Sequence, residues 1–123
     1  MPGEEILIVD DNAVNLKLAR VVLMGAGYAV KTAGSAEEAL KLLETLHPAL
    51  ILMDLQLPGM DGLELTRRLK AAPETRSVKV VALTAYAMKG DEEKARAAGC
   101  DGYLAKPIDT QKFSAQVAGY LER

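Results

Sequence analysis

The sequence predicts an α/β protein in which five parallel strands form a doubly wound sheet with five helices packed on its faces. Two observations lead to this prediction. Short apolar runs rich in β-formers alternate with amphipathic helical patterns along the whole chain, which is typical of a parallel sheet covered by helices. The runs ILIV, LILM and VVAL contain no polar residue, as expected for central strands that are buried on both faces.

Each expected strand is a short apolar run bounded by turn or capping residues. The runs cover residues 6–9, 29–32, 50–53, 78–83 and 102–104. A helical pattern follows each of them, so the chain is expected to consist of repeated strand–helix units without a linker or a low-complexity tract.

The first helix is expected over residues 13–25. Its apolar residues recur at helical spacing and would form one apolar face. That face would consist of Val14, Leu18, Val21 and Val22. The glycines at positions 25 and 27 would end the helix.

The second helix is expected to begin after Ser35 and to end near Leu46. Ser35 is a preferred capping residue, and Glu38, three positions later, completes a capping box in which each side chain satisfies a free backbone N–H. Pro48 closes the segment before the third strand.

The remaining helices are expected over 62–71, over 90–98 and from Asp109 to about residue 121. Pro73 ends the first of these, because proline cannot continue a helix. Gly99 occupies a C-cap position after the second. Asp109 would cap the last one at its start.

The composition is that of one domain, residues 1–123, which can build a core without covalent staples. Half of the 123 residues are hydrophobic, which is sufficient for a sizeable core at this length. Cys100 is the one cysteine, so no internal disulfide can form, as is typical of a reducing compartment. The formal net charge of -2 gives no indication of the basic surface that nucleic-acid binding requires.

The N-terminus and the hydropathy pattern indicate location. The first residues, MPGEE, contain neither the basic segment nor the apolar core of a signal peptide. No apolar stretch approaches the roughly 18 residues that a membrane span requires. We therefore expect a cytoplasmic protein that binds neither membranes nor nucleic acid.

Reactive side chains follow four of the five expected strands, directly after each strand ends. They are Asp10 with Asp11, Asp54, Thr84 and Lys106. Ligands of open parallel sheets bind beyond the carboxyl ends of the strands, so these side chains are expected to meet at one edge. Each of them alone could be an ordinary cap, turn or solvated residue. Their occurrence at matching positions of separate units favours a functional site.

The chemistry of this set suits phosphoryl transfer. Three carboxylates held close together repel each other, and a hard divalent cation such as Mg²⁺ relieves the repulsion while keeping positions open for a phosphoryl group. Lys106 can pair with one phosphoryl oxygen, and Thr84 can donate a hydrogen bond to another. Asp54 stands alone at the end of a central strand and is therefore the best candidate for a carboxylate nucleophile.

With these residues placed, the chain resembles a response-regulator receiver domain over its whole length. The acidic first loop of that family is matched by ILIVDDN, its phosphoacceptor loop by LILMDLQLPGMDG, its switch-hydroxyl strand by VVALTA and its lysine loop by GCDGYLAKPI. The chain further resembles DivK-like single-domain receivers, and receivers attached to hybrid histidine kinases. This resemblance lies in the runs AVNLKLARVVLMGAGY and TAYAMKGDEEKARAAGCDGYLAKPI. The resemblance implies the flavodoxin-like strand order 2-1-3-4-5.

The resemblance implies that Asp54 accepts a phosphoryl group and that Mg²⁺ is the cofactor, with Mn²⁺ as a substitute. Asp11 and Asp54 would bind the metal through their side chains. The backbone carbonyl of Gln56 would be a third protein ligand, and Asp10 would help to hold the metal, partly through water.

The resemblance also implies a switch at the phosphoryl group. Thr84 and Lys106 would contact this group, and the small Ala85 would leave it accessible. The bond between Lys106 and Pro107 would be cis. Thr84 would move toward the added oxygens, and Tyr103 would turn into the space that Thr84 leaves. The surface of the fourth helix, the fifth strand and the fifth helix would then present a different face to partners.

The implied partners are proteins. A histidine kinase or a histidine phosphotransfer protein would supply the phosphoryl group from a phosphohistidine, and a downstream protein would read the switched surface. The chain would be a phosphoacceptor switch without an output domain rather than an enzyme, with self-phosphorylation from small donors and slow autodephosphorylation. Gln56 leaves the rate of dephosphorylation open. The expected state is a monomer, and a dimer on phosphorylation stays open.

Other interpretations fit the residues less well. A phosphohydrolase of the haloacid-dehalogenase kind would have a second aspartate two residues after the nucleophile, where this chain has Gln56. A flavodoxin-like ligand binder would need a phosphate-binding loop after the first strand, where this chain has DDNA. A receiver cut from a hybrid kinase or a multidomain regulator stays open, although Met1 and the C-terminal Leu-Glu-Arg favour a free-standing protein.

Several other features are interpreted as structural. His47 is expected to be exposed, and Cys100 is expected to be a small buried side chain after a capping glycine. Arg67 and Arg68 are expected on a solvated helix face. The segment 88–90 opens the fourth helix and would be either a partner contact or a plain loop.

Overall fold

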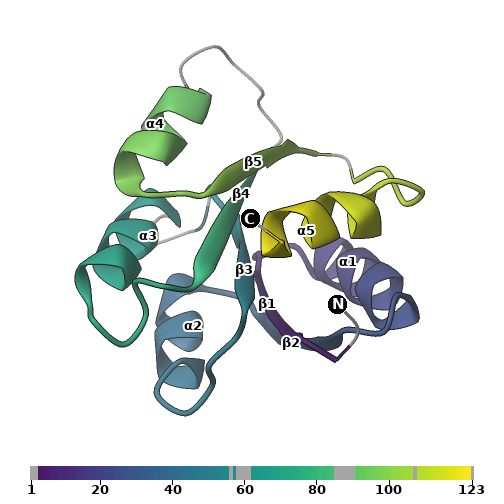
Figure 1. The fold of residues 1–123 in the computed structure, drawn as a ribbon, viewed down its shortest axis with the longest axis horizontal. Coiled ribbons are helices and arrows are strands. Elements are labelled where there is room, and N and C mark those ends of the chain that lie inside the picture. Colours follow the sequence, from purple (N-terminus) through teal and green to yellow (C-terminus); the bar gives the residue numbers. More distant parts are fainter. Residues whose placement is uncertain (1–2, 56, 58–61, 85–90, 107, 123) are drawn as a thin grey trace.

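Five parallel strands form one sheet in the order β2-β1-β3-β4-β5, which confirms the prediction (Figure 1). The computed structural model describes residues 3–55, 57, 62–84, 91–106 and 108–122. The strands are β1 Glu5–Val9, β2 Ala29–Ala33, β3 Leu50–Asp54, β4 Lys79–Thr84 and β5 Gly102–Ala105. Each neighbouring pair is parallel, so the carboxyl ends of all strands lie at the same edge of the sheet.

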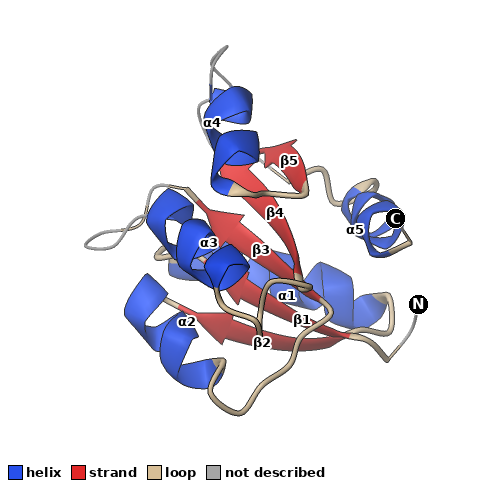
Figure 2. Cartoon of the chain, turned by 60° about the vertical axis from the view of Figure 1, so that its left-hand side comes forward, coloured by secondary structure: helices blue, strands red, loops and turns tan. Residues whose placement is uncertain are grey.

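Helices cover both faces of the sheet. α2, α3 and α4 lie on one face, and α1 and α5 lie on the other (Figures 1 and 2). The helices are α1 Ala13–Gly25, α2 Ala36–Leu42, α3 Gly62–Ala71, α4 Asp91–Ala98 and α5 Phe113–Leu121. Within the described ranges, no helix combines the length and the apolar character that crossing a membrane requires.

The central strands contribute to two cores, one on each face, because alternate residues of a strand point to opposite sides. The core under α2, α3 and α4 contains Leu7, Val9, Ile51 and Met53. The core under α1 and α5 contains Ile6, Ile8, Leu50 and Leu52. All of these side chains are buried. This two-sided burial is the reason why the runs ILIV and LILM show no alternation of polar and apolar residues.

Side chains cap the first two helices. The carboxamide oxygen of Asn12 accepts hydrogen bonds from two N–H groups of the first turn of α1, at 2.9 and 3.0 Å. The hydroxyl oxygen of Ser35 accepts the N–H of Glu38 at 3.1 Å, which confirms Ser35 as the cap of α2. The Glu38 carboxylate accepts the N–H of Gly34 at 3.2 Å, one residue before the position that a capping box predicts.

α2 is shorter than predicted, because it ends at Leu42 rather than near Leu46. The N–H groups of Glu44 and Thr45 donate to carbonyl groups three residues earlier, at 3.3 and 3.2 Å. Hydrogen bonds of this spacing tighten the last turn out of α-helical geometry. The predicted end was wrong because Pro48 sets only the last position that a helix could reach. It gives no information on where the last turn tightens before that position.

α5 begins at Phe113, later than the predicted cap implies. Asp109 instead caps a turn that leads into the helix. Its Oδ1 accepts the N–H of Gln111 at 2.9 Å, and its carbonyl oxygen accepts the N–H of Lys112 at 3.0 Å and of Phe113 at 2.9 Å. Asp109 therefore has a capping contact, but residues 110–112 form a turn rather than the first turn of an α-helix.

α1 buries a different face from the predicted one. Val14, Leu18 and Val21 are 75%, 38% and 61% exposed, whereas Ala19 and Leu23 are 1% and 0% exposed. A helix with two apolar rows at the same spacing gives a periodicity that does not tell which row packs on the sheet. The predicted apolar face was therefore wrong for the first three residues, which we call the exposed stripe of α1.

Two glycine substitutions should change stability in opposite directions. A Cβ on Gly102 would overlap the ring of Tyr120, so Gly102→Ala is expected to lower the free energy of unfolding by about 1–3 kcal/mol. Gly119 lies inside α5 with open space around it, so Gly119→Ala should raise that free energy by about 0.5–1 kcal/mol. Urea unfolding followed by circular dichroism measures both. A gain in stability from Gly102→Ala would contradict the packing of α5 on β5.

Candidate functional site

Three carboxylates gather where β1 and β3 end. Asp10 directly follows β1 and Asp54 is the last residue of β3, and the two strands are neighbours in the sheet. Asp11 follows Asp10, and one oxygen of each carboxylate lies within 4.8 Å of the other two. Asp10 and Asp54 are 1% and 5% exposed, whereas Asp11 is exposed. We call these three residues the acidic cluster.

Main-chain hydrogen bonds hold this edge of the sheet. The N–H of Asp10 donates to the carbonyl of Ala33 in β2 at 3.1 Å, and the N–H of Leu55 donates to the carbonyl of Leu83 in β4 at 3.2 Å. Asp10 Oδ1 also accepts the N–H of Asn12 at 2.9 Å. Two of the carboxylates are therefore placed by the sheet itself, which prevents them from moving apart to relieve their repulsion.

Lys106 brings a positive charge into the acidic cluster. It follows β5, and its N–H donates to the carbonyl of Thr84 at 2.7 Å. Its Nζ lies 2.8 Å from Asp10 Oδ2 and 3.2 Å from Asp54 Oδ2. Burial disfavours the charged amine, but the hydrogen bond and charge of Asp10 and the charge of Asp54 outweigh it, so the pKa of Lys106 lies above its ordinary value. The sequence placed Lys106 at this edge but did not predict that it bonds two carboxylates.

The acidic cluster is suited to a divalent cation. Three carboxylates and one ammonium group leave a formal charge of -2, which a divalent cation neutralises. Two oxygens bound to Mg²⁺ at about 2.1 Å lie at most about 4.2 Å apart. The carboxylate oxygens lie within 4.8 Å of one another, so small side-chain rotations would bring them to the distances that the ion requires. The exposure of Asp11 leaves solvent access for the waters that Mg²⁺ retains. The residues present could therefore hold a metal ion.

Thr84 and Tyr103 lie on the strands that adjoin this edge. Thr84 is the last residue of β4, pairs with Ala105 of β5 and is 2% exposed. Tyr103 lies opposite Ala82 in the same pair of strands. Its side chain packs against the core under α2, α3 and α4, and its hydroxyl oxygen is buried. The structure therefore places both residues, while their roles as a switch stay predictions.

Some residues named from the sequence lie outside the described part of the chain. They are Gln56, Ala85, Pro107 and the segment 88–90. The backbone metal ligand at Gln56, the phosphoryl contact at Ala85 and the cis bond before Pro107 therefore stay predictions.

The other sequence features have the surroundings that were expected. His47 is exposed. Arg67 and Arg68 are exposed and form ion pairs with Glu64 at 3.8 and 3.2 Å on the outer side of α3. Cys100 is buried, and this burial raises the pKa of its thiol, so it lacks the character of an activated nucleophile.

Sequence reasoning did not recognise that the stripe of α1 is exposed. Among the described residues, the large hydrophobic side chains that remain exposed all lie on this helix, and they are Val14, Leu18, Val21 and Met24. α1 begins two residues after Asp11, so the first residue of the stripe, Val14, follows the acidic cluster by three positions in the chain. The sequence did contain a signal for this exposure. α1 has two apolar rows, and the sheet can cover only one side of a helix. An exposed apolar patch of this kind is typical of a protein-binding surface.

Known proteins resemble the chain over almost its whole length. The family described as response regulator receiver domain matches residues 6–118. The polar-differentiation response regulator DivK of Brucella ovis is 46% identical over 118 residues, which cover 96% of each chain. A response regulator structure from Chloroflexus aurantiacus is 36% identical, with a TM-score of 0.93 over 98% of this chain and 99% of that one. The receiver domain of the sensor histidine kinase PA1611 of Pseudomonas aeruginosa, with a magnesium ion coordinated in its active site cleft, is also 36% identical, with a TM-score of 0.89 and the same coverage.

Replacing Lys106 by methionine should destabilise the metal-free protein. The change leaves the acidic cluster without its positive charge, so the free energy of unfolding should fall by about 2–4 kcal/mol. Lys94→Met, on the exposed side of α4, is the matched control and should change it by less than about 0.5 kcal/mol.

The effect of Lys106→Met should not vary with pH near neutrality. Because the folded pKa of Lys106 is raised, its ammonium group stabilises the fold fully below the ordinary value of 10.5 and loses this effect only as the pH rises through the raised pKa. Urea unfolding of wild type and variant between about pH 6 and pH 9 tests this. A difference that shrinks across that range would contradict the ion pair.

Proposed function

The chain belongs to the response regulator receiver domain family, and from this we propose that it is a phosphoaccepting switch of a two-component phosphorelay. Asp54 accepts the phosphoryl group from a phosphohistidine of a histidine kinase or a histidine phosphotransfer protein. The observation that supports this most directly is the position of Asp54 at the end of the buried strand β3, within the acidic cluster and 3.2 Å from Lys106 Nζ.

Among the three carboxylates, Asp54 is best suited to be the nucleophile. Asp10 uses both of its oxygens, because Oδ1 accepts the N–H of Asn12 and Oδ2 lies 2.8 Å from Lys106 Nζ. Asp11 is exposed and lies beyond the end of β1, so the sheet does not hold it. Asp54 is part of β3, and its contact with Lys106 is the longer of the two.

The proposed transfer forms one bond and breaks one. A carboxylate oxygen of Asp54 attacks phosphorus, the P–N bond of the donor breaks, and its electron pair returns to the imidazole nitrogen, which leaves an acyl phosphate on Asp54. Lys106 turns from the carboxylates to one phosphoryl oxygen, and Thr84 donates a hydrogen bond to another.

Mg²⁺, or Mn²⁺ in its place, supplies charge neutralisation between the carboxylates and the phosphoryl oxygens when it is bound. The acidic cluster would hold it, together with the backbone carbonyl of Gln56. The formal charge of -2 that remains beside Lys106 supports a divalent ion.

The same step would supply the signal. Phosphorylation adds charge and acceptor oxygens at the sheet edge, toward which Thr84 moves. The carbonyl of Thr84 accepts the N–H of Lys106 at 2.7 Å, which supports a joint response of the two residues. Tyr103 would turn into the space that Thr84 leaves, and the burial of its hydroxyl oxygen among residues of the core supports a position close to the interior. A downstream protein would then read the surface of α4, β5 and α5.

The exposed stripe of α1 suits a protein donor of the phosphoryl group. The stripe begins three positions after Asp11 in the chain, so a protein that brings its phosphohistidine to Asp54 would be placed to cover this apolar surface at the same time. Lys17 and Arg20 are exposed on the same helix. These two cations would favour a donor that carries acidic residues at the rim of the contact.

Several finer expectations stay predictions. They are the extent of the domain as residues 1–123, the cytoplasmic location and the monomeric state, with dimerisation on phosphorylation left open. They also include self-phosphorylation from small donors and slow autodephosphorylation by a protein that is otherwise not an enzyme.

Acetyl phosphate should add one phosphoryl group to the wild type. Intact mass spectrometry should show a single adduct in the presence of Mg²⁺ and no adduct after the metal is chelated. Asp54→Asn removes the nucleophile and should show none. Asp109→Asn, in the exposed turn before α5, is the matched control and should react like the wild type. A full adduct on Asp54→Asn would rule out Asp54 as the acceptor.

A charge in the exposed stripe should weaken transfer from a protein donor. Val21 is 61% exposed, so Val21→Glu should fold normally while placing a carboxylate in the apolar contact. We expect phosphotransfer from a histidine phosphotransfer protein to slow by at least about tenfold, while labelling by acetyl phosphate is unchanged. Lys41→Glu, exposed on α2 on the other face of the sheet, is the control. Equal rates for both variants and the wild type would show that donors do not use α1.

A further inference from the structure

The first turn of α3 lies against the backbone of the phosphoacceptor. A Cβ on Gly62 would overlap the carbonyl oxygen of Asp54 and would lie 3.0 Å from the Cα of Leu55, so glycine is needed for this approach. The carbonyl of Gly62 accepts the hydroxyl of Thr66 at 2.7 Å, and both residues are buried. The start of α3 is therefore in direct contact with the main chain that carries Asp54.

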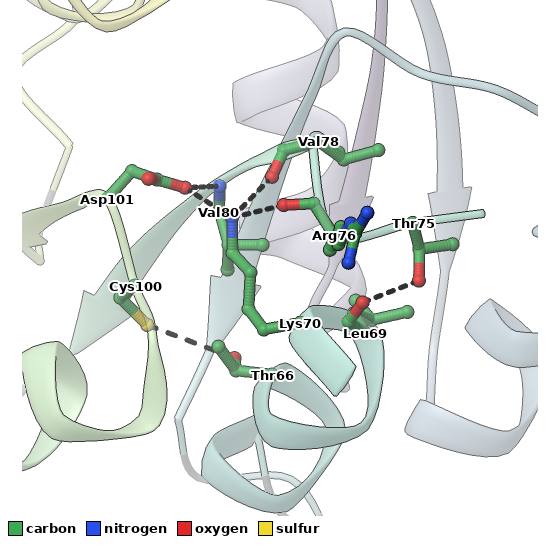
Figure 3. A network of polar contacts seen from close by, with 9 residues as sticks. All are labelled: Thr66, Leu69, Lys70, Thr75, Arg76, Val78, Val80, Cys100 and Asp101. Atoms are coloured by element: carbon green, nitrogen blue, oxygen red, sulfur yellow. Dashed lines mark hydrogen bonds and ion pairs between the residues drawn. The ribbon is translucent and has the colours of Figure 1, made fainter. Parts of the chain in front are cut away.

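The last turn of α3 is held by Lys70. Its Nζ donates to the carbonyl of Val78 at 2.8 Å and to that of Arg76 at 3.3 Å, and lies 2.8 Å from Asp101 Oδ2 (Figure 3). The three donors of the ammonium group are thus all engaged. The side chains of Lys70 and Asp101 are 21% and 34% exposed, so solvent screens their ion pair only in part.

Asp101 joins this contact to the sheet. The oxygen that pairs with Lys70 also accepts the N–H of Val80 at 2.9 Å, and the N–H of Asp101 donates to the carbonyl of Val80 at 2.7 Å. Gly99 has a φ of +109°, and a Cβ there would lie 2.8 Å from the Cγ of Lys70. The aliphatic part of Lys70 therefore lies against the turn between α4 and β5, and the ion pair fixes that turn to both α3 and β4.

α3 connects its two ends as one packed body. Gly62 and Lys70 are separated by about 12 Å along the helix. Between them, Leu65 and Leu69 are 0% and 2% exposed in the core. The hydroxyl of Thr75 donates to the carbonyl of Leu69 at 2.6 Å, which satisfies an acceptor at the end of the helix (Figure 3). A closely packed helix transmits a displacement of one end to the other.

We propose that Lys70 and Asp101 position the phosphoacceptor through α3. Their ion pair holds the last turn of α3 against β4 and the turn after α4, and this keeps the first turn of the helix seated on the carbonyl of Asp54. The carboxylate of Asp54 then meets the metal and the phosphoryl group in a geometry that is already formed. Lys70 and Asp101 do not contact the reacting atoms, so they are positioning residues. This inference rests on the proposed function of Asp54.

Thermodynamic linkage makes the proposal measurable. If the ion pair favours the geometry of Asp54 that binds a phosphoryl group, a ligand at Asp54 must stabilise the ion pair by the same factor. An ion pair with a purely structural role changes the stability of the fold and leaves the affinity for that ligand unchanged. The affinity of the folded protein for a ligand at Asp54 therefore separates the two roles.

Beryllofluoride together with Mg²⁺ is the probe, because it binds a carboxylate in the shape of a phosphoryl group. Titration calorimetry would compare the wild type with Lys70→Met, Asp101→Asn and the double variant. We expect each single variant to bind about fivefold more weakly, and the double variant to bind as weakly as a single one, since the pair acts as a unit. Arg68→Met is the matched control on the exposed side of α3 and should bind like the wild type.

The outcomes distinguish this proposal from the proposed function. A wild type that does not bind beryllofluoride overturns both. If the wild type binds beryllofluoride and the folded variants bind it with an affinity within about twofold of the wild type, only the positioning role of Lys70 and Asp101 is overturned. The proposed function then stands. Should the variants not fold, amide hydrogen exchange of the wild type decides. Beryllofluoride should slow exchange at the N–H of Val80 and Asp101 more than at that of Ala39 in α2, and equal slowing overturns the proposal.

Discussion

Three carboxylates are held close together where β1 and β3 end, and their mutual repulsion opposes the packing of the strands that carry them. Like charges at this spacing would move apart if the chain allowed it. β1 and β3 do not allow it, because both strands are packed on both faces and Asp10 and Asp54 are placed by the sheet. Lys106 reduces the charge without cancelling it. What remains is a negative site on a rigid support, which is open to a divalent cation on the side of Asp11.

The two faces of the sheet serve this site in different ways. On one face, α3 starts on the backbone of Asp54 and is joined at its other end to β4 and to the turn before β5 through Lys70 and Asp101. On the other face, α1 starts beside the acidic cluster and leaves an apolar stripe in solvent. In the proposed function, the first face would hold Asp54 in place, and the second would receive the protein that brings the phosphoryl group.

The parts of the structure that could be predicted have local signals. The strand before Asp54 is an uninterrupted apolar run. Because parallel strands end at one edge of a sheet, residues from distant positions can be predicted to lie together even when the packing is not known. The cap at Ser35 is likewise a pattern of neighbouring residues. The end of α2 and the start of α5 were misplaced in the prediction. Both boundaries depend on whether a backbone N–H donates to the carbonyl three or four residues earlier. The identity of the side chains does not determine this choice.

The fold class, the order of the elements along the chain, and the grouping of the acidic cluster with Lys106 could all be predicted, since they follow from periodicity and from where parallel strands end. Which apolar row of α1 is buried, and which partners Lys106 and Lys70 have, depends on how the helices and strands pack together. Two rows at the same helical spacing are equivalent until a sheet covers one of them. A lysine pairs with whichever carboxylate the fold brings within reach, and Lys70 and Asp101 are 31 positions apart in the chain. Such choices depend on distances between elements, and no local pattern contains those distances.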